Sequence, residues 1–332
     1  MFMKRNTIDV LYATNSHYLL YTLASMLSFI EHSGLGQDKI NIHLMTEGCR
    51  GDDYRFAQEV LSDFSHVFLS IYPIEEYSMS KYHIPPWQNT QVANARLFFQ
   101  DILGSKIADI DSLLYLDSDT MVVGSLEELL DKKDGLYAVR DNCQPSYYRR
   151  FGLDKYFNSG VLWIDTKSWI ENHYQDKIVT FIKSNRDIKL KYPDQDILNC
   201  SLKDDIKELT HSYNLSPYIA MSSDFGLRYY CRREGIDYKE VQEERIHPKI
   251  IHSCGILGIK PWTQNQVNPY NDIFRDYIKR VDCSFEVESL DSIKSFLSEN
   301  PRLFSMFLNL KTFTPDCVHQ ATVSLLSKIK SK

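Results

Sequence analysis

The sequence predicts an α/β protein in which a mixed, Rossmann-like sheet is flanked by helices and followed by a small helical C-terminal extension. Three observations lead to this prediction. Short β-rich apolar runs alternate with helical stretches, an acidic tripeptide directly follows one of those runs, and the β signals fade after about Asp272. Such alternation is typical of parallel strands joined by helical crossovers. We therefore expect one large domain over residues 1–270 and an extension over residues 271–332.

The composition is that of a chain that folds in water. Hydrophobic residues make up 43% and charged residues 25% of the 332 residues, close to globular averages. The formal net charge of −6 argues against a protein that coats nucleic acid, because phosphate binding needs a positive surface. The seven cysteines never follow a C-x-x-C spacing, which predicts reduced thiols in the cytoplasm and argues against a zinc cluster.

The N-terminal region opens with a strand at Ile8–Ala13, followed by polar turn residues and a helix over Tyr18–Ile30. The uncharged stretch Val10–Ile30 is long enough to suggest a membrane anchor, but Thr14 to His17 interrupt it. The remaining apolar part is too short to span a bilayer. We therefore expect a helix buried against a sheet, and we see no cleavable export signal.

The next elements continue the alternation of strands and helices. A predicted helix leads into Leu113–Leu116, which we expect to be a central strand because the run is fully apolar. Ligands of doubly wound sheets collect beyond the carboxyl ends of such strands, so residues 117–119 stand where chemistry is expected. The other predictions are strands at Ile40–Thr46, His66–Tyr72, Phe157–Ile164 and Ile246–His252, and helical stretches at 52–63, Val92–Leu103, Lys167–Lys183 and Asp194–Leu202.

Asp117-Ser118-Asp119 places two carboxylates together at the end of the central strand. Oxygen ligands suit Mg²⁺ or Mn²⁺, and such a cation neutralises a diphosphate as it departs. The same spacing recurs at Asp109–Asp111 and Asp194–Asp196, so only the preceding apolar run selects one copy. A solvated strand end explains the pattern equally well.

His252 ends a predicted strand and is followed by Gly255 and Lys260. Imidazole is a good ligand for Mn²⁺, a glycine lets the backbone approach a phosphate, and a lysine places positive charge on it. These three residues together could serve a metal–diphosphate group. A histidine considered alone is more often structural than a ligand.

Two further segments offer polar groups for a sugar. Asn158-Ser159-Gly160 supplies an amide and a hydroxyl of the kind that sugar hydroxyls bind, although the composition of the segment favours a simple Asn-Ser-Gly turn. Asp194 opens a predicted helix, where aspartates act as caps. Capping does not exclude a second role for Gln195, whose amide could face a reacting sugar carbon.

In this order along the chain, the motifs resemble those of the retaining glycosyltransferases of family 8. This family includes bacterial lipopolysaccharide galactosyltransferases and glycogenin-like enzymes. The resemblance implies a GT-A fold in residues 1–270 as a nucleotide-sugar-binding catalytic domain, a UDP-hexose donor carrying galactose or glucose, and Mn²⁺ as the usual metal, with Mg²⁺ as the alternative. The motifs that carry it are Tyr12–Asn15, Ala95–Leu97, Leu114–Asp119, Phe157–Val161, Asp194–Asn199 and His252–Trp262.

The resemblance also implies roles for individual residues. By motif position Asp117, Asp119 and His252 look like metal ligands, and Gln195 and Asp194 look like the catalytic pair. Two positions depart from the family pattern: Asn15 stands where members usually carry an aspartate, and the segment between Gly255 and Lys260 is longer than usual. The donor site that the resemblance implies contains Ala13, Thr14, Asn15, Tyr18, Arg96, Asp117, Ser118, Asp119, Asn158, Ser159, Asp194, Gln195, His252, Gly255 and Lys260.

Two other functions remain open from the sequence. A sugar-phosphate nucleotidyltransferase can use a similar sheet and acidic pair, but it should carry a glycine-rich loop after the first strand, and Ala13 to Tyr18 contain no glycine. A non-catalytic sugar- or nucleotide-binding module would need neither a metal nor turnover of UDP.

The C-terminal tail differs in composition from the rest of the chain. Between Pro301 and Lys332 five basic residues stand against Asp316 alone, with leucine, phenylalanine and valine interleaved. This pattern predicts either a helical pair packed on the catalytic domain or a peripheral contact with the inner face of the cell membrane. The expected acceptor is a glycan, lipid-linked or glycoprotein substrate, read by loops such as Asn142–Lys155 and Ser216–Glu244.

Overall fold

A computed structural model of the chain describes residues 7–77, 79–86, 89–254, 259–290, 295, 299–300 and 303–304. The chain divides into two compact units. Unit 1 comprises Met1–Asp141 and Lys155–Leu209, and unit 2 comprises Asn142–Asp154 and Thr210–Lys332. Each unit has a hydrophobic core of its own.

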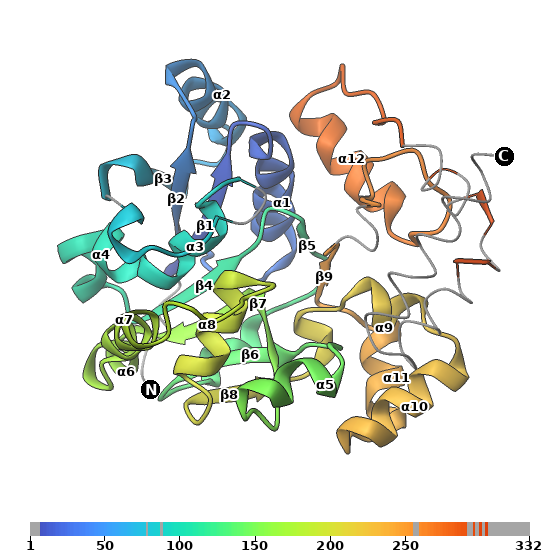
Figure 1. The fold of residues 1–332 in the computed structure, drawn as a ribbon. Coiled ribbons are helices and arrows are strands. Elements are labelled where there is room, and N and C mark those ends of the chain that lie inside the picture. The colour runs from blue at the N-terminus through green and yellow to red at the C-terminus, as the bar shows by residue number, and fades with distance from the viewer. Residues whose placement is uncertain are drawn as a thin grey trace, which may run out of the picture. The chain divides into compact units, whose positions relative to one another are not determined.

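Unit 1 contains the large sheet. Its strands lie in the order β3-β2-β1-β4-β7-β6-β8, which Figure 1 shows running from β3 at one edge to β8 at the other. The elements of unit 1 are β1 (Thr7–Asn15), α1 (Leu19–His32), β2 (Lys39–Glu47), α2 (Gly51–Leu61), β3 (Val67–Pro73), η1 (Ile74–Tyr77), η2 (Met79–Tyr82), α3 (Val92–Ala95), η3 (Arg96–Phe98), α4 (Phe99–Leu103), η4 (Gly104–Asp109), β4 (Ser112–Leu116), β5 (Thr120–Val122), η5 (Glu127–Asp131), β6 (Leu136–Arg140), β7 (Phe157–Asp165), α6 (Thr166–Glu171), α7 (Tyr174–Ser184), α8 (Pro193–Ser201) and β8 (Ile206–Leu209).

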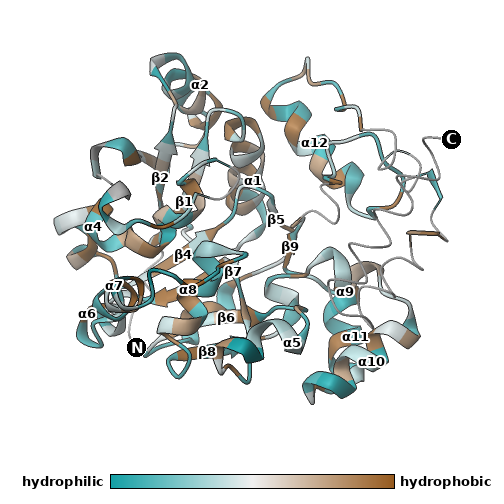
Figure 2. Ribbon diagram, viewed as in Figure 1, coloured by the Kyte–Doolittle hydropathy of each residue, from teal (hydrophilic) through white to brown (hydrophobic). Residues whose placement is uncertain are grey.

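Both faces of the sheet are covered, as its continuous apolar strands require. On one face Tyr12 of β1 is fully buried and its hydroxyl accepts a hydrogen bond from Ser25 of α1 at 3.4 Å. On the other face Leu11, Leu113 and Tyr115 join a core that also contains residues of η3, α4, α7 and α8. Figure 2 shows hydrophobic residues concentrated along the strands and hydrophilic residues over α2. Because successive side chains of a strand point to opposite faces, a continuous apolar run makes both faces of the sheet apolar.

The direction of β7 is the feature of the sheet that matters most for the site. β1, β2, β3 and β4 run parallel to one another, whereas β7 pairs antiparallel with both β4 and β6. Leu116 at the end of β4 therefore faces Val161, and the Asp117 amide donates to the Gly160 carbonyl at 2.8 Å. The N-terminal residues of β7 consequently lie beside the carboxyl end of β4.

The predicted strands at 8–13, 40–46, 66–72, 113–116 and 157–164 are confirmed within one or two residues at most ends. The predicted helices over 18–30 and 194–202 are also confirmed. The fold class predicted from the sequence is thus confirmed for unit 1, as a mixed sheet flanked by helices.

Three predictions of single elements were wrong in detail. The stretch Lys167–Lys183 forms two helices, α6 and α7, because His173 between them takes a left-handed backbone with φ of 53°. The stretch Val92–Leu103 is divided into α3, η3 and α4. Ile246 ends a helix, and only Ile250–His252 forms a strand.

Unit 2 is mainly helical. The Arg233 guanidinium of α10 donates to the Cys143 carbonyl at 3.3 Å, which fixes the segment before α5 to α10. Within the described residues, none of the helices combines the length and the apolar character needed to cross a bilayer. The basic tail singled out from the sequence lies almost entirely outside the described residues. The elements of unit 2 are α5 (Pro145–Tyr148), η6 (Arg149–Phe151), η7 (His211–Tyr213), α9 (Pro217–Met221), α10 (Asp224–Glu234), α11 (Tyr238–Ile246), β9 (Ile250–His252) and α12 (Asn271–Val281).

Candidate active site

The carboxyl ends of the neighbouring strands β1 and β4 are joined by hydroxyl groups. Ser118 donates to the Ala13 carbonyl at 3.0 Å. The Thr22 hydroxyl of α1 lies 2.9 Å from Ser118 Oγ and 2.8 Å from Thr14 Oγ1. The structure therefore brings together Ala13, Thr14 and Ser118, three residues that the sequence predicted for the donor site.

Asn15 and Tyr18 form the turn between β1 and α1. The Tyr18 amide donates to the Asn15 carbonyl at 3.0 Å and to its side-chain oxygen at 3.1 Å. Asparagine closes such turns because its short side chain bonds the nearby backbone. The side chain of Asn15 thus helps to hold the residues that connect the strand to the helix.

Arg96 is the centre of the charged groups in unit 1. Its side chain is only 6% exposed, and its guanidinium lies 2.7 Å from Asp117 Oδ1 and 3.3 Å from Asp194 Oδ2. It also donates to the Ser159 carbonyl at 2.7 Å. The ring of Tyr115 lies beneath it, 4.6 Å from the guanidinium carbon. Arg96, a buried cation in η3, thus contacts Asp117 after β4, Ser159 near the start of β7 and Asp194 near the start of α8.

The surroundings of this group shift its pKa values in directions that follow from burial and charge. Burial acts to lower the pKa of Arg96, but its acidic neighbours, Asp117 foremost, together outweigh burial and the pKa is raised. Burial raises the pKa of Asp194, although Arg96 acts in the opposite direction. Burial likewise raises the pKa of Tyr115 well above its ordinary value, so its hydroxyl stays a neutral donor.

The acidic pair after β4 has the donor atoms of a divalent cation site. A carboxylate oxygen of Asp117 and one of Asp119 lie within 4.8 Å of each other. Asp119 is buried, whereas Asp117 is half-buried and accepts a hydrogen bond at 2.7 Å from the Tyr115 hydroxyl. Paired carboxylates of this kind suit Mg²⁺ or Mn²⁺.

Gln195 connects α8 to the first residues of β7. Its side-chain oxygen accepts a hydrogen bond from the Ser159 amide at 3.1 Å and another from Asn158 Nδ2 at 3.2 Å. The Asn158 amide also donates to Asp141 Oδ2 at 3.0 Å. Asp194, the residue before Gln195, accepts from the Ser159 hydroxyl at 2.8 Å. Amide and hydroxyl groups of Asn158, Ser159 and Gln195 thus lie together with the carboxylates of Asp141 and Asp194.

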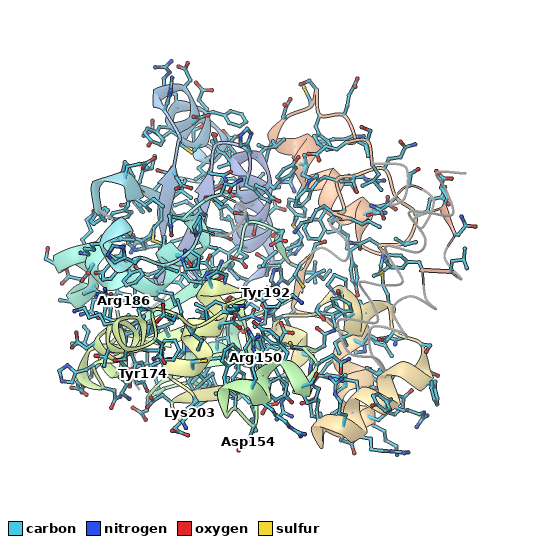
Figure 3. The ribbon with its side chains drawn as sticks, viewed as in Figure 1. Arg150, Asp154, Tyr174, Arg186, Tyr192 and Lys203 are labelled. Atoms are coloured by element: carbon cyan, nitrogen blue, oxygen red, sulfur yellow. The ribbon has the colours of Figure 1, made fainter. Side chains whose placement is uncertain are left out.

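The other two acidic pairs in the sequence have different surroundings. Asp109 and Asp111 are exposed. Asp196 is fully buried, and its Oδ2 accepts from the backbone amides of Lys191 at 2.9 Å and Tyr192 at 3.0 Å. Figure 3 labels Tyr192 on the segment that leads into α8. The carboxylate of Asp196 therefore holds this segment, whereas that of Asp194 faces Arg96.

In unit 2 His252 ends β9 and is 3% exposed. Its ring nitrogen Nδ1 lies 2.9 Å from Asn214 Oδ1, and this contact orients the imidazole. Lys260 donates to the Ser253 carbonyl at 2.9 Å. Gly255, which the sequence predicted for the diphosphate, lies outside the described residues.

The family model described as "Glycosyl transferase family 8" matches residues 9–266. The chain belongs to glycosyl transferase family 8. Its sheet order and acidic pair agree with the resemblance that the sequence motifs indicated. The family 8 chain is therefore a glycosyltransferase.

Two relatives of this family 8 enzyme illustrate its similarity to known proteins. General stress protein A of Bacillus subtilis (strain 168) is 28% identical over 253 residues, which cover 72% of this chain and 82% of that protein. A lipopolysaccharide 1,2-glucosyltransferase of Escherichia coli is 28% identical over 274 residues, covering 78% of this chain and 74% of the relative.

Solved structures agree on the GT-A fold. The galactosyltransferase LgtC, in complex with donor and acceptor sugar analogues, gives a TM-score of 0.64 at 22% identity and covers 82% of this chain and 95% of LgtC. The apo structure of the bifunctional glycosyltransferase WbbM gives a TM-score of 0.66 at 19% identity over 83% of this chain. The matched region covers 50% of the WbbM chain.

Two residues of the site escaped the sequence analysis. Asp141 directly follows β6, a short strand that the sequence had not indicated, so its position at a strand end could not be seen. Tyr115 lies within the apolar run of β4 and was taken as core. The alternation of side chains along β4 could have shown that Tyr115 and Asp117 share one face.

Proposed function

We propose that this glycosyltransferase moves a hexose, galactose or glucose, from a UDP-sugar to a hydroxyl of a glycan or glycoconjugate, with retention of configuration and with Mn²⁺. The observation that carries the proposal is the acidic pair after β4, which stands beside the buried group of Arg96, Asp194 and Gln195. Membership of a glycosyltransferase family argues against the nucleotidyltransferase and the non-catalytic binding module.

In this proposal the metal ligands are Asp117, Asp119 and His252, the three residues that the motifs shared with family 8 assign to the metal. Two carboxylates and an imidazole fit Mn²⁺, and Mg²⁺ is the alternative because it also prefers oxygen ligands. When bound, the cation neutralises charge on the diphosphate that leaves with the nucleotide. The orientation of His252 by Asn214 supports a fixed ligand.

The nucleoside and diphosphate parts of the donor are assigned to separate groups of residues. We assign the nucleoside to the ends of β1 and β4, where Ala13, Thr14 and Ser118 lie together. Asn15 and Tyr18 extend that group. In unit 2, Lys260 would place its ammonium group against the diphosphate, with Gly255 as a backbone contact.

We assign the hexose to the groups gathered around β7 and α8. Asn158 and Ser159 offer neutral hydrogen-bonding groups, Asp194 offers a carboxylate, and Arg96 holds these elements together. Sugar hydroxyls need such mixed donors and acceptors. Gln195 would stand nearest to the anomeric carbon.

For the mechanism we propose front-face substitution. Retention requires either a covalent glycosyl-enzyme or attack from the face that the leaving group has just vacated. The Gln195 side-chain oxygen is a poor nucleophile, since it belongs to an uncharged amide and already accepts two hydrogen bonds. A phosphate oxygen of the departing UDP takes the acceptor's proton, and the Lys260 ammonium stabilises the charge that develops.

Replacement of Gln195 by Ala tests this mechanism. We expect loss of most turnover without a covalent species, because the amide only positions and polarises. Intact-protein mass spectrometry after incubation with the donor checks this expectation. An adduct of hexose mass on Asp194 would instead establish double displacement.

The donor hexose and the acceptor are tested by a screen. UDP release is measured with UDP-galactose and UDP-glucose, and with a wider panel of nucleotide sugars. The relatives include a lipopolysaccharide 1,2-glucosyltransferase, so lipopolysaccharide-type glycans are the first acceptors to try. Release from neither UDP-hexose would contradict the proposed donor class.

We also propose that residues 1–270 act as the catalytic domain and that residues 271–332 form an extension which contacts the inner face of the cell membrane. The support is the basic and apolar composition of the tail after Pro301. A chain truncated after Glu299 should sediment less with vesicles of anionic phospholipid than the full chain does. Equal sedimentation of the two chains would exclude the membrane role.

A further inference from the structure

We propose that Asn199 is a positioning residue, which sets the place of the Gln195 side chain by fixing α8 to the first residue of β7. This inference rests on the catalytic role proposed for Gln195. Asn199 lies outside the groups assigned above to metal, nucleotide or sugar. It is only 1% exposed, so its side chain acts inside the protein.

The amide of Asn199 uses its hydrogen-bonding groups on two partners. Its Oδ1 accepts from the Phe157 amide at 2.7 Å, and its Nδ2 donates to the Phe157 carbonyl at 2.8 Å. The same Nδ2 donates to the Gln195 carbonyl at 2.8 Å. Both N–H bonds of the side chain are therefore used, together with its oxygen.

Phe157 is bound in the way that a neighbouring strand would bind it, through both of its backbone groups. The two residues that follow it, Asn158 and Ser159, are those that donate to the Gln195 side-chain oxygen. Asn199 lies one helical turn after Gln195, so the two side chains share one face of α8. Helix and strand are thus joined at two neighbouring points, one formed by Asn199 and the other by Gln195.

Loss of the Asn199 hydrogen bonds should loosen the contacts that the Gln195 side chain makes with β7. Without Asn199 the buried Phe157 amide and carbonyl lose their side-chain partner, and the start of β7 can shift against α8. Small displacements of a reacting group lower the rate much more than they lower ground-state binding. A purely structural residue would instead lower stability and leave the rate of the folded enzyme unchanged.

A double-mutant cycle distinguishes these two roles. N199A, Q195A and the double variant are compared for kcat and KM of UDP release, for UDP binding by calorimetry and for Tm. We expect N199A to lower kcat by about 10- to 100-fold while KM and UDP affinity stay within about twofold. In the Q195A background the same change should lower kcat by less than about twofold, because the group that it positions is gone. The Tm should fall equally in both backgrounds.

The matched control is S201A on the same helix. Among the residues that the structure describes, the Ser201 hydroxyl bonds only the carbonyls of its own helix, Ile197 at 2.7 Å and Leu198 at 3.4 Å, so this change should leave kcat unaltered. If N199A fails to fold, N199D takes its place, because it keeps the size and the acceptor for the Phe157 amide but loses both donated bonds. If Q195A leaves too little turnover to measure at steady state, single-turnover measurement with excess enzyme takes its place.

Equal losses of kcat from N199A in the wild-type and Q195A backgrounds would overturn the inference, as would an unchanged kcat in N199A. A Q195A variant with wild-type turnover is a different result. It would remove the proposed role of Gln195, and with it the basis of the inference.

Discussion

At the scale of single residues, Arg96 balances the charge of the site. Its guanidinium contacts both Asp117 and Asp194; Arg96 and Asp194 are buried and Asp117 is half-buried. Two carboxylates in this environment repel each other, and burial removes part of their hydration. A neighbouring cation offsets both costs. The arginine therefore keeps both acids in place for whatever ligand they bind.

Replacement of Arg96 by Met should lower the free energy of unfolding by about 3–5 kcal/mol, the usual cost of leaving buried charges without their partner. Urea unfolding at neutral pH measures this change. R96K is the control, because it keeps the charge but cannot contact both acids in the same way, and it should lose less. A loss below about 1 kcal/mol for R96M would contradict the proposed balance of charge.

Asp194 should make stability depend on pH in a direction opposite to that of an ordinary salt-bridged acid. Because burial raises its pKa, the folded chain binds a proton more readily than the unfolded chain does, and stability falls as the pH rises from the ordinary value through the raised one. D194N removes this titration. The difference in unfolding free energy, D194N minus wild type, should therefore increase over a pH range that begins near the ordinary aspartate pKa of about 4. Urea unfolding across that range tests it, and a difference that decreases with pH would show that ionisation of Asp194 stabilises the fold.

At the scale of elements, the reversed direction of β7 assembles the site. The start of this strand, with Asn158 and Ser159, lies beside the carboxyl end of β4 only because the two strands are antiparallel. The sequence predicted β7 from its apolar run, but its direction is not encoded in that run. Direction depends on pairing with β4 and β6, which is a tertiary property.

Short or half-polar strands also escaped the sequence analysis for physical reasons. In β8, Ile206 and Leu209 are buried while Lys207 and Glu208 between them are exposed. A pattern of four residues is too short to distinguish from a helical turn. The late strand is also shorter than predicted, because α11 continues to Ile246 and only Ile250–His252 is strand.

The break between α6 and α7 gives a test at this scale. His173 adopts a left-handed backbone conformation, which costs a residue with a side chain about 1 kcal/mol and costs glycine little. H173G should therefore raise the free energy of unfolding by about that amount. Thr180, exposed within α7, is the control, because T180G should lower it by about 0.5 kcal/mol. Loss of stability in H173G would show that its backbone is not strained.

The sequence predicted the place of those site residues that directly follow a recognisable strand. Asp117 and Asp119 follow a fully apolar strand, so their place could be expected. The choice of Asp194 over Asp196 came from the family resemblance and not from the residue pattern, because it depends on which carboxylate contacts Arg96 and which binds the backbone before α8. The partner of an acid is decided by packing between elements far apart in sequence.

At the scale of the whole molecule, the account depends on the residues that the family resemblance assigns to the metal and the donor. Unit 1 carries the acidic pair and the groups around Gln195, and unit 2 carries His252 and Lys260. The central claim is that a divalent cation held by these ligands makes UDP a good leaving group. The family match supports glycosyl transfer, and the acidic pair supports the cation.

The most direct measurement is UDP release by the full chain, first freed of metal with a chelator and then titrated with Mn²⁺. The account predicts that turnover of the UDP-hexose selected in the screen disappears with the chelator and returns with Mn²⁺. It also predicts that D119N loses about a hundredfold or more at every Mn²⁺ concentration. Undiminished turnover in the chelator, or in D119N, would contradict it.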